Sequence, residues 1–374
     1  AKPPGDNSPP AKSRATTRAL EISRIHSLCC CIWPTTSSTF IEVTPAVSIV
    51  WAAAVPATVA IPRATISPMP QRPEDQPHDD HPPGRDPHGP RPDGMPATLR
   101  EIVEHKRLEV ERRKAEISMR ELESLVAQAE PPRNFFRAVT RHPPGMHTSV
   151  IAEIKRRSPS AGLIRPEYEG DAFRPEDIAR QYLDAGASAI SCLTDEKFFG
   201  GRLSFIERVK DAVPLPVLRK DFIIDPWQLW ESRAHGADAV LLIAECLNES
   251  QLVDMLILAQ QLQLTTLLEV HAMDNLLRVR PHVGFPHPGY ALLGINNRDL
   301  DDMTTDLGHT LRLVDMVEDR SILVSESGIR SPDDLARLRT HGVRIVLVGE
   351  HLMRHEHPGE ALKALLEPTL GPLD

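Results

Sequence analysis

The sequence contains few cysteines, and they form no recognisable pattern. Five occur among 374 residues; three are adjacent near the N-terminus and two are isolated, at Cys192 and Cys246. No pair has C-x-x-C spacing, and three neighbouring cysteines cannot easily share one tetrahedral metal ion. We therefore expect no metal site and no disulfide framework. This pattern indicates a reducing compartment, and we predict a cytoplasmic protein.

An excess of positive charge and an apolar run of membrane length are also lacking. The formal net charge is −9, so bulk electrostatics do not suggest a nucleic-acid partner. The apolar stretch 46–61 is interrupted by Pro56 and is shorter than the roughly 20 residues that a membrane helix needs. Hydrophobic content of 41% and charged content of 25% are typical of a globular protein. We expect neither nucleic acid nor membrane as a partner.

Residues 1–94 differ in composition from the rest of the chain. They hold 17 of the 35 prolines, and the stretch 71–94 has no aliphatic or aromatic residue. Such a segment buries too little apolar surface to offset the entropy lost on ordering, so we predict a disordered, proline-rich extension. Two alternatives stay open: a transit peptide, and an over-extended reading frame in which Met95 is the start.

From Met95 onward the sequence reads as one folded domain, 95–374. Residues 97–127 have helical period and are rich in Glu, Arg and Leu, which predicts one or two helices with a break near Ser118. The adjacent prolines 131–132 end this pattern.

Beyond residue 148, short β-rich runs alternate eight times with helix-length segments. Several helical segments begin at Ser, Asp or Pro and end near Gly, which are helix start and stop signals. The predicted strands are Ser149–Lys155, Ala189–Leu193, Val217–Lys220, Ala239–Ile243, Thr265–Val270, Ala291–Asn296, Ser321–Ser325 and Ile345–Val348. Eight such units predict an α/β fold of the (β/α)8 type, a TIM barrel. A doubly wound open sheet is the alternative, although its G-x-G-x-x-G fingerprint is missing.

Charged residues lie where the predicted strands end, and in this kind of barrel the carboxyl ends of the strands carry the chemistry. Ile151, Glu153 and Lys155 share one face of the first strand because side chains alternate, while the apolar residues between them share the other. We expect the apolar face to pack against helices and Glu153 and Lys155 to point into the barrel mouth.

Lys220, Glu269 and Glu326 end three further strands. Each alone could be a salt bridge on the rim. Grouped with Glu153 and Lys155 in a partly dry mouth, they would have perturbed pKa values, which suit acid–base chemistry.

The last two strands are followed by Ser327-Gly328 and Gly349-Glu350. Loops at this position often bind phosphate through backbone N–H groups, and glycine permits the close approach. Together with Ser158 and Arg298, they predict a phosphate site. Because a carboxylate repels a phosphate dianion, we expect the side chain of Glu350 to point away from it.

Seven stretches occur in an order that resembles a known family. They are AEIKRRSPSAG, LTDEKFFGG, VLRKDFI, LLEVH, GINNRDL, SESGI and VGEHLMR. Over residues 95–367 the chain resembles the indole-3-glycerol phosphate synthases of tryptophan biosynthesis. The resemblance implies a barrel that closes the indole ring of 1-(2-carboxyphenylamino)-1-deoxyribulose 5-phosphate, releasing CO2 and water, without a cofactor.

The resemblance also implies roles for individual residues. Lys220 is expected to be the general acid at the C2′ carbonyl oxygen, and Lys155 to pair with the substrate carboxylate. Glu269 is expected to be the general base, or the acid for loss of the hydroxyl; Glu153 would orient Lys155 or share the base role. The remaining implied positions are Asn296 and Glu326 at the substrate hydroxyls, Phe199 and Phe222 against the aromatic ring, and Ser158, Arg298, Ser327, Gly328, Gly349 and Glu350 around the phosphate, the last two through backbone.

Three rival functions remain to be separated from this one. A phosphoribosylanthranilate isomerase would need a Cys/Asp acid–base pair, and no Cys ends the first strand. A Schiff-base aldolase would need a lysine buried for imine formation. A barrel that only binds ligands would not need the acid, base and phosphate stretches together. We expect a monomer or a weak homo-oligomer.

Overall fold

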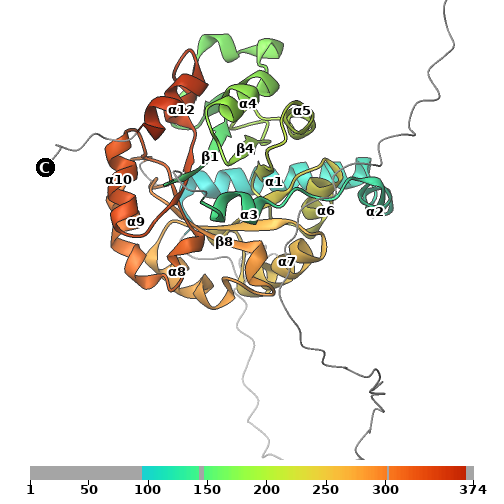
Figure 1. The fold of residues 1–374 in the computed structure, drawn as a ribbon. Helices are drawn as coiled ribbons and strands as arrows, with labels where there is room; N and C mark the ends of the chain where they lie inside the picture. Colours follow the sequence, from blue (N-terminus) through green and yellow to red (C-terminus); the bar gives the residue numbers. More distant parts are fainter. Residues whose placement is uncertain (1–94, 143–146, 301–302, 368–374) are drawn as a thin grey trace, which may run out of the picture. The chain divides into compact units, whose positions relative to one another are not determined.

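Eight parallel strands close into a barrel in the computed structural model, which describes residues 95–142, 147–300 and 303–367 (Figure 1). The predicted extension, 1–94, lies outside the described residues. Around the ring the order is β1, β10, β9, β8, β7, β6, β5 and β4, and β1 pairs with both β4 and β10. A ring without edges confirms the TIM barrel and shows that the doubly wound alternative is wrong. The strands are β1 Ser149–Ile154, β4 Ala189–Leu193, β5 Val217–Lys220, β6 Ala239–Ile243, β7 Thr265–Val270, β8 Ala291–Asn296, β9 Leu323–Glu326 and β10 Ile345–Val348.

Two strands differ from the prediction, at three boundaries in all. β1 ends at Ile154, one residue early, whereas β9 begins at Leu323 rather than at Ser321 and ends at Glu326 rather than at Ser325. The reason for the second difference is a 3-10 turn that the β-rich pattern conceals: the Asp319 carboxylate accepts the N–H of Ser321 at 2.9 Å and starts η7, Arg320–Ile322. A short antiparallel pair, β2 Arg157–Ser158 and β3 Gly162–Leu163, lies in the loop after β1.

Helices surround the barrel, and many begin with a residue whose side chain caps them (Figure 1). The predicted break near Ser118 is where α2 starts, because Ser118 and Glu121 each accept the other's backbone N–H. None of the helices in the described ranges combines the length and apolar content needed to cross a bilayer. The α-helices are α1 Ala97–Glu116, α2 Met119–Gln128, α3 Phe135–Thr140, α4 Pro175–Asp184, α5 Ser204–Ala212, α6 Pro226–Ala234, α7 Glu249–Gln261, α8 Met273–Val279, α9 Gly308–Leu313, α10 Pro332–Thr340, α11 Glu350–Met353 and α12 Pro358–Leu366. The other 3-10 turns are η1 Pro166–Tyr168, η2 Gly170–Ala172, η3 Ala244–Cys246, η4 Arg280–His282, η5 Pro288–Tyr290 and η6 Val314–Met316.

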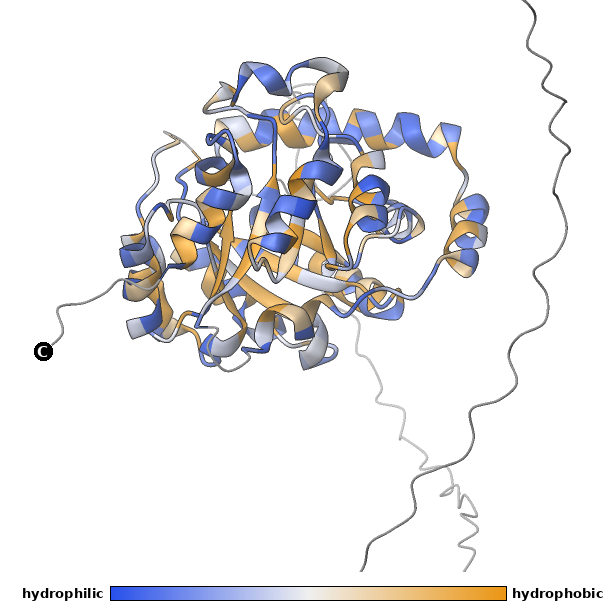
Figure 2. Ribbon diagram, turned by 45° about the horizontal axis from the view of Figure 1, so that its top comes forward, coloured by the Kyte–Doolittle hydropathy of each residue, from blue (hydrophilic) through white to orange (hydrophobic). Residues whose placement is uncertain are grey.

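The strands at the centre of the molecule are mostly hydrophobic (orange in Figure 2), and because side chains alternate along each strand their apolar residues belong to two cores. Val150, Ala152 and Ile154 belong to the larger core between strands and helices, as predicted for the apolar face of the first strand. Ile151 belongs to the smaller core inside the barrel. The face of β1 that carries Glu153 is therefore the inner face.

Helices before β1 contact both the inner core and the barrel mouth. Phe135 and Val139 of α3 are fully buried in the inner core. Leu99 and Ile102 of α1 instead line the cavity at the carboxyl ends of the strands. The mouth is thus partly walled by a helix that precedes the barrel in sequence.

Candidate active site

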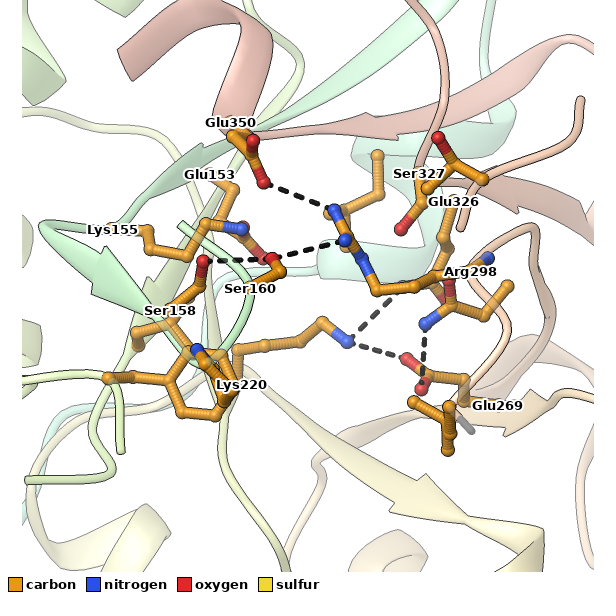
Figure 3. A pocket seen from close by; sticks show the side chains of 18 of the residues that line it. Glu153, Lys155, Ser158, Ser160, Lys220, Glu269, Arg298, Glu326, Ser327 and Glu350 are labelled. Atoms are coloured by element: carbon orange, nitrogen blue, oxygen red, sulfur yellow. Dashed lines mark hydrogen bonds and ion pairs between the residues drawn. The ribbon is translucent and has the colours of Figure 1, made fainter. Parts of the chain in front are cut away.

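A cavity of about 490 Å³ lies at the carboxyl ends of the barrel strands (Figure 3). Every residue predicted for the site lines it. These residues are Glu153, Lys155, Ser158, Phe199, Lys220, Phe222, Glu269, Asn296, Arg298, Glu326, Ser327, Gly328, Gly349 and Glu350. Strand register brings them together, because the ends of parallel strands meet at one rim.

Lys220 contacts two carboxyl groups at the bottom of the cavity. Its Nζ lies 2.5 Å from Glu269 Oε2 and 3.2 Å from Glu326 Oε2. Asn296 donates from Nδ2 to Glu269 Oε1 at 3.2 Å. The side chain of Lys220 points from β5 across the cavity toward β7 and β9 (Figure 3).

Burial and charge shift the pKa values of Lys220, Glu269 and Glu326 in different directions. Burial would lower the pKa of Lys220, but the charges of Glu269 and Glu326 outweigh it and raise that pKa. Burial would raise the pKa of Glu269, but Lys220 and His271 lower it to about 2. Burial and then the charge of Glu269 raise the pKa of Glu326 well above its usual range. These shifts favour the charged forms of Lys220 and Glu269 and the neutral form of Glu326.

Glu153 and Lys155 form a second pair across the cavity. Lys155 Nζ lies 2.6 Å from Glu153 Oε1, and the two side chains are 12% and 6% exposed. The Glu153 carboxylate occupies the space that a Cβ at position 349 would take, so Gly349 is needed to admit it. A glycine predicted for a phosphate loop also makes room for an acidic residue.

A chain of polar contacts links the predicted phosphate residues. Arg298 donates from Nη1 to Ser160 Oγ at 3.1 Å, and Ser160 Oγ lies 3.2 Å from Ser158 Oγ. Arg298 Nη2 lies 3.1 Å from Glu350 Oε2, and Arg354 pairs with the other Glu350 oxygen at 2.6 Å. The expectation that the Glu350 side chain points away is therefore wrong: Glu350 turns toward the guanidinium because that cation attracts it (Figure 3).

The loop after β9 adopts a backbone conformation that favours close approach of a ligand. Ser327 has φ 65° and Gly328 has φ 78°, both in the left-handed region. Asn297 holds this loop by donating from Nδ2 to the Ser327 carbonyl at 3.1 Å, and its Oδ1 accepts the Thr310 hydroxyl at 2.8 Å. Asn297 was not predicted as a site residue, although it stands in the same GINNRDL stretch as Asn296 and Arg298.

Phe199 and Phe222 face each other on one wall, with ring centroids 6.0 Å apart and planes inclined at 38°. Two buried carboxylates fix their backbones. Asp195 accepts the Phe199 N–H at 3.3 Å, and Asp221 accepts the Phe222 N–H at 2.8 Å. Lys106 of α1 reaches both carboxylates at 3.0 Å. This lysine was not predicted, because its partners lie far along the chain.

His271 also lines the cavity and was not predicted. Its Nε2 lies 3.2 Å from Glu269 Oε1, and its Nδ1 lies 3.3 Å from Glu245 Oε2. The signal was available, because His271 follows Glu269 by two residues and so shares its side of the strand. Within the described ranges, no group of three or more His, Cys, Asp or Glu is arranged to hold a metal ion.

Comparison with known proteins gives one consistent result. A family model described as indole-3-glycerol phosphate synthase matches residues 99–365. Three curated relatives carry that name. The one from Acidithiobacillus ferrooxidans is 45% identical over 72% of this chain and 99% of its own length. The relative from Rhodospirillum rubrum is 42% identical over 73% of this chain and 100% of its own length. The relative from Bacteroides thetaiotaomicron is 41% identical over 73% of this chain and 99% of its own length.

Proposed function

The chain belongs to the indole-3-glycerol phosphate synthase family, and we propose how its cavity divides the work of that reaction. The enzyme is a carboxy-lyase of tryptophan biosynthesis with a phosphorylated small-molecule substrate. It converts 1-(2-carboxyphenylamino)-1-deoxyribulose 5-phosphate into indole-3-glycerol phosphate, CO2 and water. The roles of single residues, given next, are the proposal.

The reaction sets a definite demand for protons. The ring carbon that bears the carboxylate bonds to C2′, and the carbonyl oxygen takes a proton to become a hydroxyl. CO2 then leaves, and its bonding electrons return to the ring. The hydroxyl takes a second proton and departs as water while C1′ loses one. Two protons are delivered and one is recovered, so each turnover draws one proton from solvent when the carboxylate enters ionised.

Lys220 is the general acid at the C2′ oxygen. The observation that carries this role is its buried ammonium, held 2.5 Å from Glu269 and 3.2 Å from Glu326. A fixed cation stabilises the oxyanion that develops there. The contact with Glu269 also provides a direct path by which Lys220 can be reprotonated.

Glu269 is the base that takes the proton from C1′. Its depressed pKa keeps it ionised at neutral pH, and Asn296 orients it by the 3.2 Å hydrogen bond to Oε1. Glu326, whose neutral form is favoured by burial and by the charge of Glu269, hydrogen-bonds a substrate hydroxyl. Acid and base functions are thus held by different members of one contact group.

Lys155 binds the substrate carboxylate, and Glu153 orients it through their 2.6 Å contact. Phe199 and Phe222 supply an apolar wall for the aromatic ring. The phosphate binds at the opposite end of the substrate, where Arg298 and the left-handed backbone of Ser327-Gly328 lie. The other groups proposed there are the Ser158 hydroxyl and the backbone of Gly349 and Glu350. Binding energy at this remote phosphate pays for orientation at the reacting carbons.

The test compares the full chain with Lys220→Met in a fluorescence assay for the indole product. We expect the parent to turn the substrate over and Lys220→Met to lose roughly 10²–10⁴-fold in kcat while remaining folded by circular dichroism. Lys363→Met, at an exposed lysine that pairs with Glu360, is the matched control and should behave as the parent. Near-normal turnover in Lys220→Met would show that the acid is another residue.

We further propose that the enzyme acts in the cytoplasm as a monomer or weak homo-oligomer without nucleic acid. In support, Cys192 is buried with its pKa raised by burial to about 12, and both cysteines of the described ranges are free thiols. Sedimentation of the full chain over a range of concentrations tests the oligomeric part. A tight dimer at nanomolar concentration contradicts it.

A further inference from the structure

His271 lies where the proton balance of the reaction needs a connection. It directly follows β7 and lines the cavity beside Glu269, yet none of the roles assigned above uses it. It is also partly exposed: its side chain retains 9% exposure and that of Glu245 retains 8%, against 3% for Glu269. The imidazole therefore lies between two buried carboxylates, of which Glu245 is the more exposed.

The contacts of His271 form an unbroken series with Lys220. Glu245 Oε2 lies 3.3 Å from His271 Nδ1, and His271 Nε2 lies 3.2 Å from Glu269 Oε1. The other oxygen of Glu269 lies 2.5 Å from Lys220 Nζ. Each member is thus within reach of the next for proton transfer.

Glu245 is fixed by its own contacts. Its Oε1 accepts the backbone N–H of His271 at 2.9 Å and the Asn275 amide at 3.0 Å. These donors leave Oε2 directed at the imidazole. The carboxylate is therefore preorganised to accept or return a proton at Nδ1, and the imidazole plane is held between its two carboxylates.

The charges around the imidazole keep its protonated form accessible. The groups facing it are Glu245, Glu269, Lys220 and His309 of α9. Burial alone would lower the pKa of His271, but the hydrogen bond to Glu245 and the charge of Glu269 raise it. An imidazole that can hold a proton at either nitrogen near neutral pH is suited to pass one.

We propose that His271 relays the solvent proton of each turnover from Glu245 to Glu269, and so to Lys220. Glu245 gives a proton to Nδ1 as Nε2 gives its own to Glu269. Glu269 passes it to Lys220, which has donated twice and recovered once. To close the cycle, Glu245 takes a proton from solvent, and the imidazole, left with its proton on Nδ1, releases that proton to solvent and takes another at Nε2. His271 is a positioning and relay residue, because it acts through Glu269. The inference rests on the proposed role of Glu269.

The experiment measures kcat and KM of the full chain with His271→Asn, His271→Ala and Glu245→Gln. We expect kcat to fall about ten- to a hundredfold, less than for loss of a direct acid or base, and KM to change by less than about threefold. Added imidazole should restore part of the kcat of His271→Ala in a saturable way. His282→Asn, which alters an exposed His–Glu pair joined at 3.0 Å, is the matched control and should show neither effect.

Two outcomes overturn the relay. One is a kcat like that of the parent in either His271→Asn or Glu245→Gln. The other is a lost kcat in folded His271→Ala that imidazole does not restore, which marks a structural role. If His271→Ala does not fold, Glu245→Gln decides, because it keeps the hydrogen-bond acceptor for Asn275. Glu269→Gln separates this failure from failure of the base assignment: active Glu269→Gln refutes the base, whereas inactive Glu269→Gln beside active His271 variants refutes the relay alone.

Discussion

Glu350 illustrates how a single side chain can oppose the ligand of its own site. Its carboxylate pairs with Arg298 at 3.1 Å and with Arg354 at 2.6 Å. Burial would raise the pKa of Glu350, but the hydrogen bond to Arg354 and the charges of Lys155 and Arg298 lower it. Glu350 is therefore an anion at neutral pH. A phosphate that binds Arg298 must compete with this anion.

Replacing Glu350 with Ser should therefore strengthen phosphate binding. A half-buried ion pair of this kind is worth about 0.2–1 kcal/mol, which corresponds to a factor of roughly 1.4 to five in affinity. We expect the inhibition constant of inorganic phosphate to fall by that factor in Glu350→Ser. Glu360→Ser, in an exposed pair with Lys363, should leave it unchanged. Weaker phosphate inhibition in Glu350→Ser would mean that Glu350 orients Arg298 instead of competing for it.

At this scale the sequence located residues better than it described their contacts. The residues predicted from the alternation along strands and from the order of motifs all line the same cavity. The orientation of Glu350 was predicted wrongly because only its repulsion from a bound phosphate was considered. Its attraction to Arg298 and Arg354 was left out. His271 was missed although the same alternation applied to it. Which group faces which across the barrel depends on strand register, and a single sequence does not display register.

Among the elements, α1 is held to the barrel by buried charge. Lys106 is fully buried and contacts Glu109 at 2.8 Å and Asp195 and Asp221 at 3.0 Å each. Arg219 adds a second cation 3.0 Å from Asp221. The cluster ties a helix before the barrel to the ends of β4 and β5, from which Phe199 and Phe222 reach the cavity.

Lys106→Met should destabilise the fold because it leaves buried carboxylates uncompensated. Breaking a buried ion pair by removing one partner costs about 3–5 kcal/mol. We expect a loss of that size in the free energy of unfolding, measured by urea titration at pH 7. Lys363→Met, at an exposed pair, should differ from the parent by less than about 0.5 kcal/mol.

The same variant should alter the dependence of stability on pH. Burial would raise the pKa of Asp221, but Lys106 and then Arg219 lower it well below its usual range. A carboxyl group with a depressed folded-state pKa contributes stability above its unfolded-state pKa of about 3.9, and that contribution is lost as the pH falls. Between about pH 5 and 3 the parent should therefore lose stability more steeply than Lys106→Met. Parallel curves would show that Lys106 does not set the pKa of Asp221.

The elements themselves were largely predictable, since six of the eight strands begin and end where the sequence pattern placed them. Their regularity comes from alternating burial and from capping residues, both local signals. The start of β9 was wrong because a turn capped by Asp319 includes Ser321 and Ile322, which the predicted strand had taken as its first two residues. The attachment of α1 was unpredictable for the opposite reason, since it depends on ion pairs between distant segments.

Over the whole molecule, one end of the barrel is packed with side chains and the other end holds the cavity. At the end where the strands begin, Phe135 and Val139 of α3 pack into the core inside the barrel. The end at which the strands finish carries the cavity, and α1 completes its wall with Leu99 and Ile102. We therefore expect catalysis to need α1 as well as the eight strand–helix units, and the matched family region begins within that helix, at residue 99.

We propose that residues 95–374 form the complete catalytic unit, which leads to a prediction about deletion. Removing 1–94 should leave kcat and KM within about twofold of the full chain, because α1 and every cavity residue are retained. Removing 1–118 is the matched deletion. It takes away the wall formed by Leu99 and Ile102 and the ammonium of Lys106, so it should abolish turnover and lower the unfolding midpoint. For both deletions, indole fluorescence measures turnover and urea titration measures the unfolding midpoint. A large loss on removing 1–94 alone would show that the extension contributes to the site, and full activity after removing 1–118 would show that α1 does not.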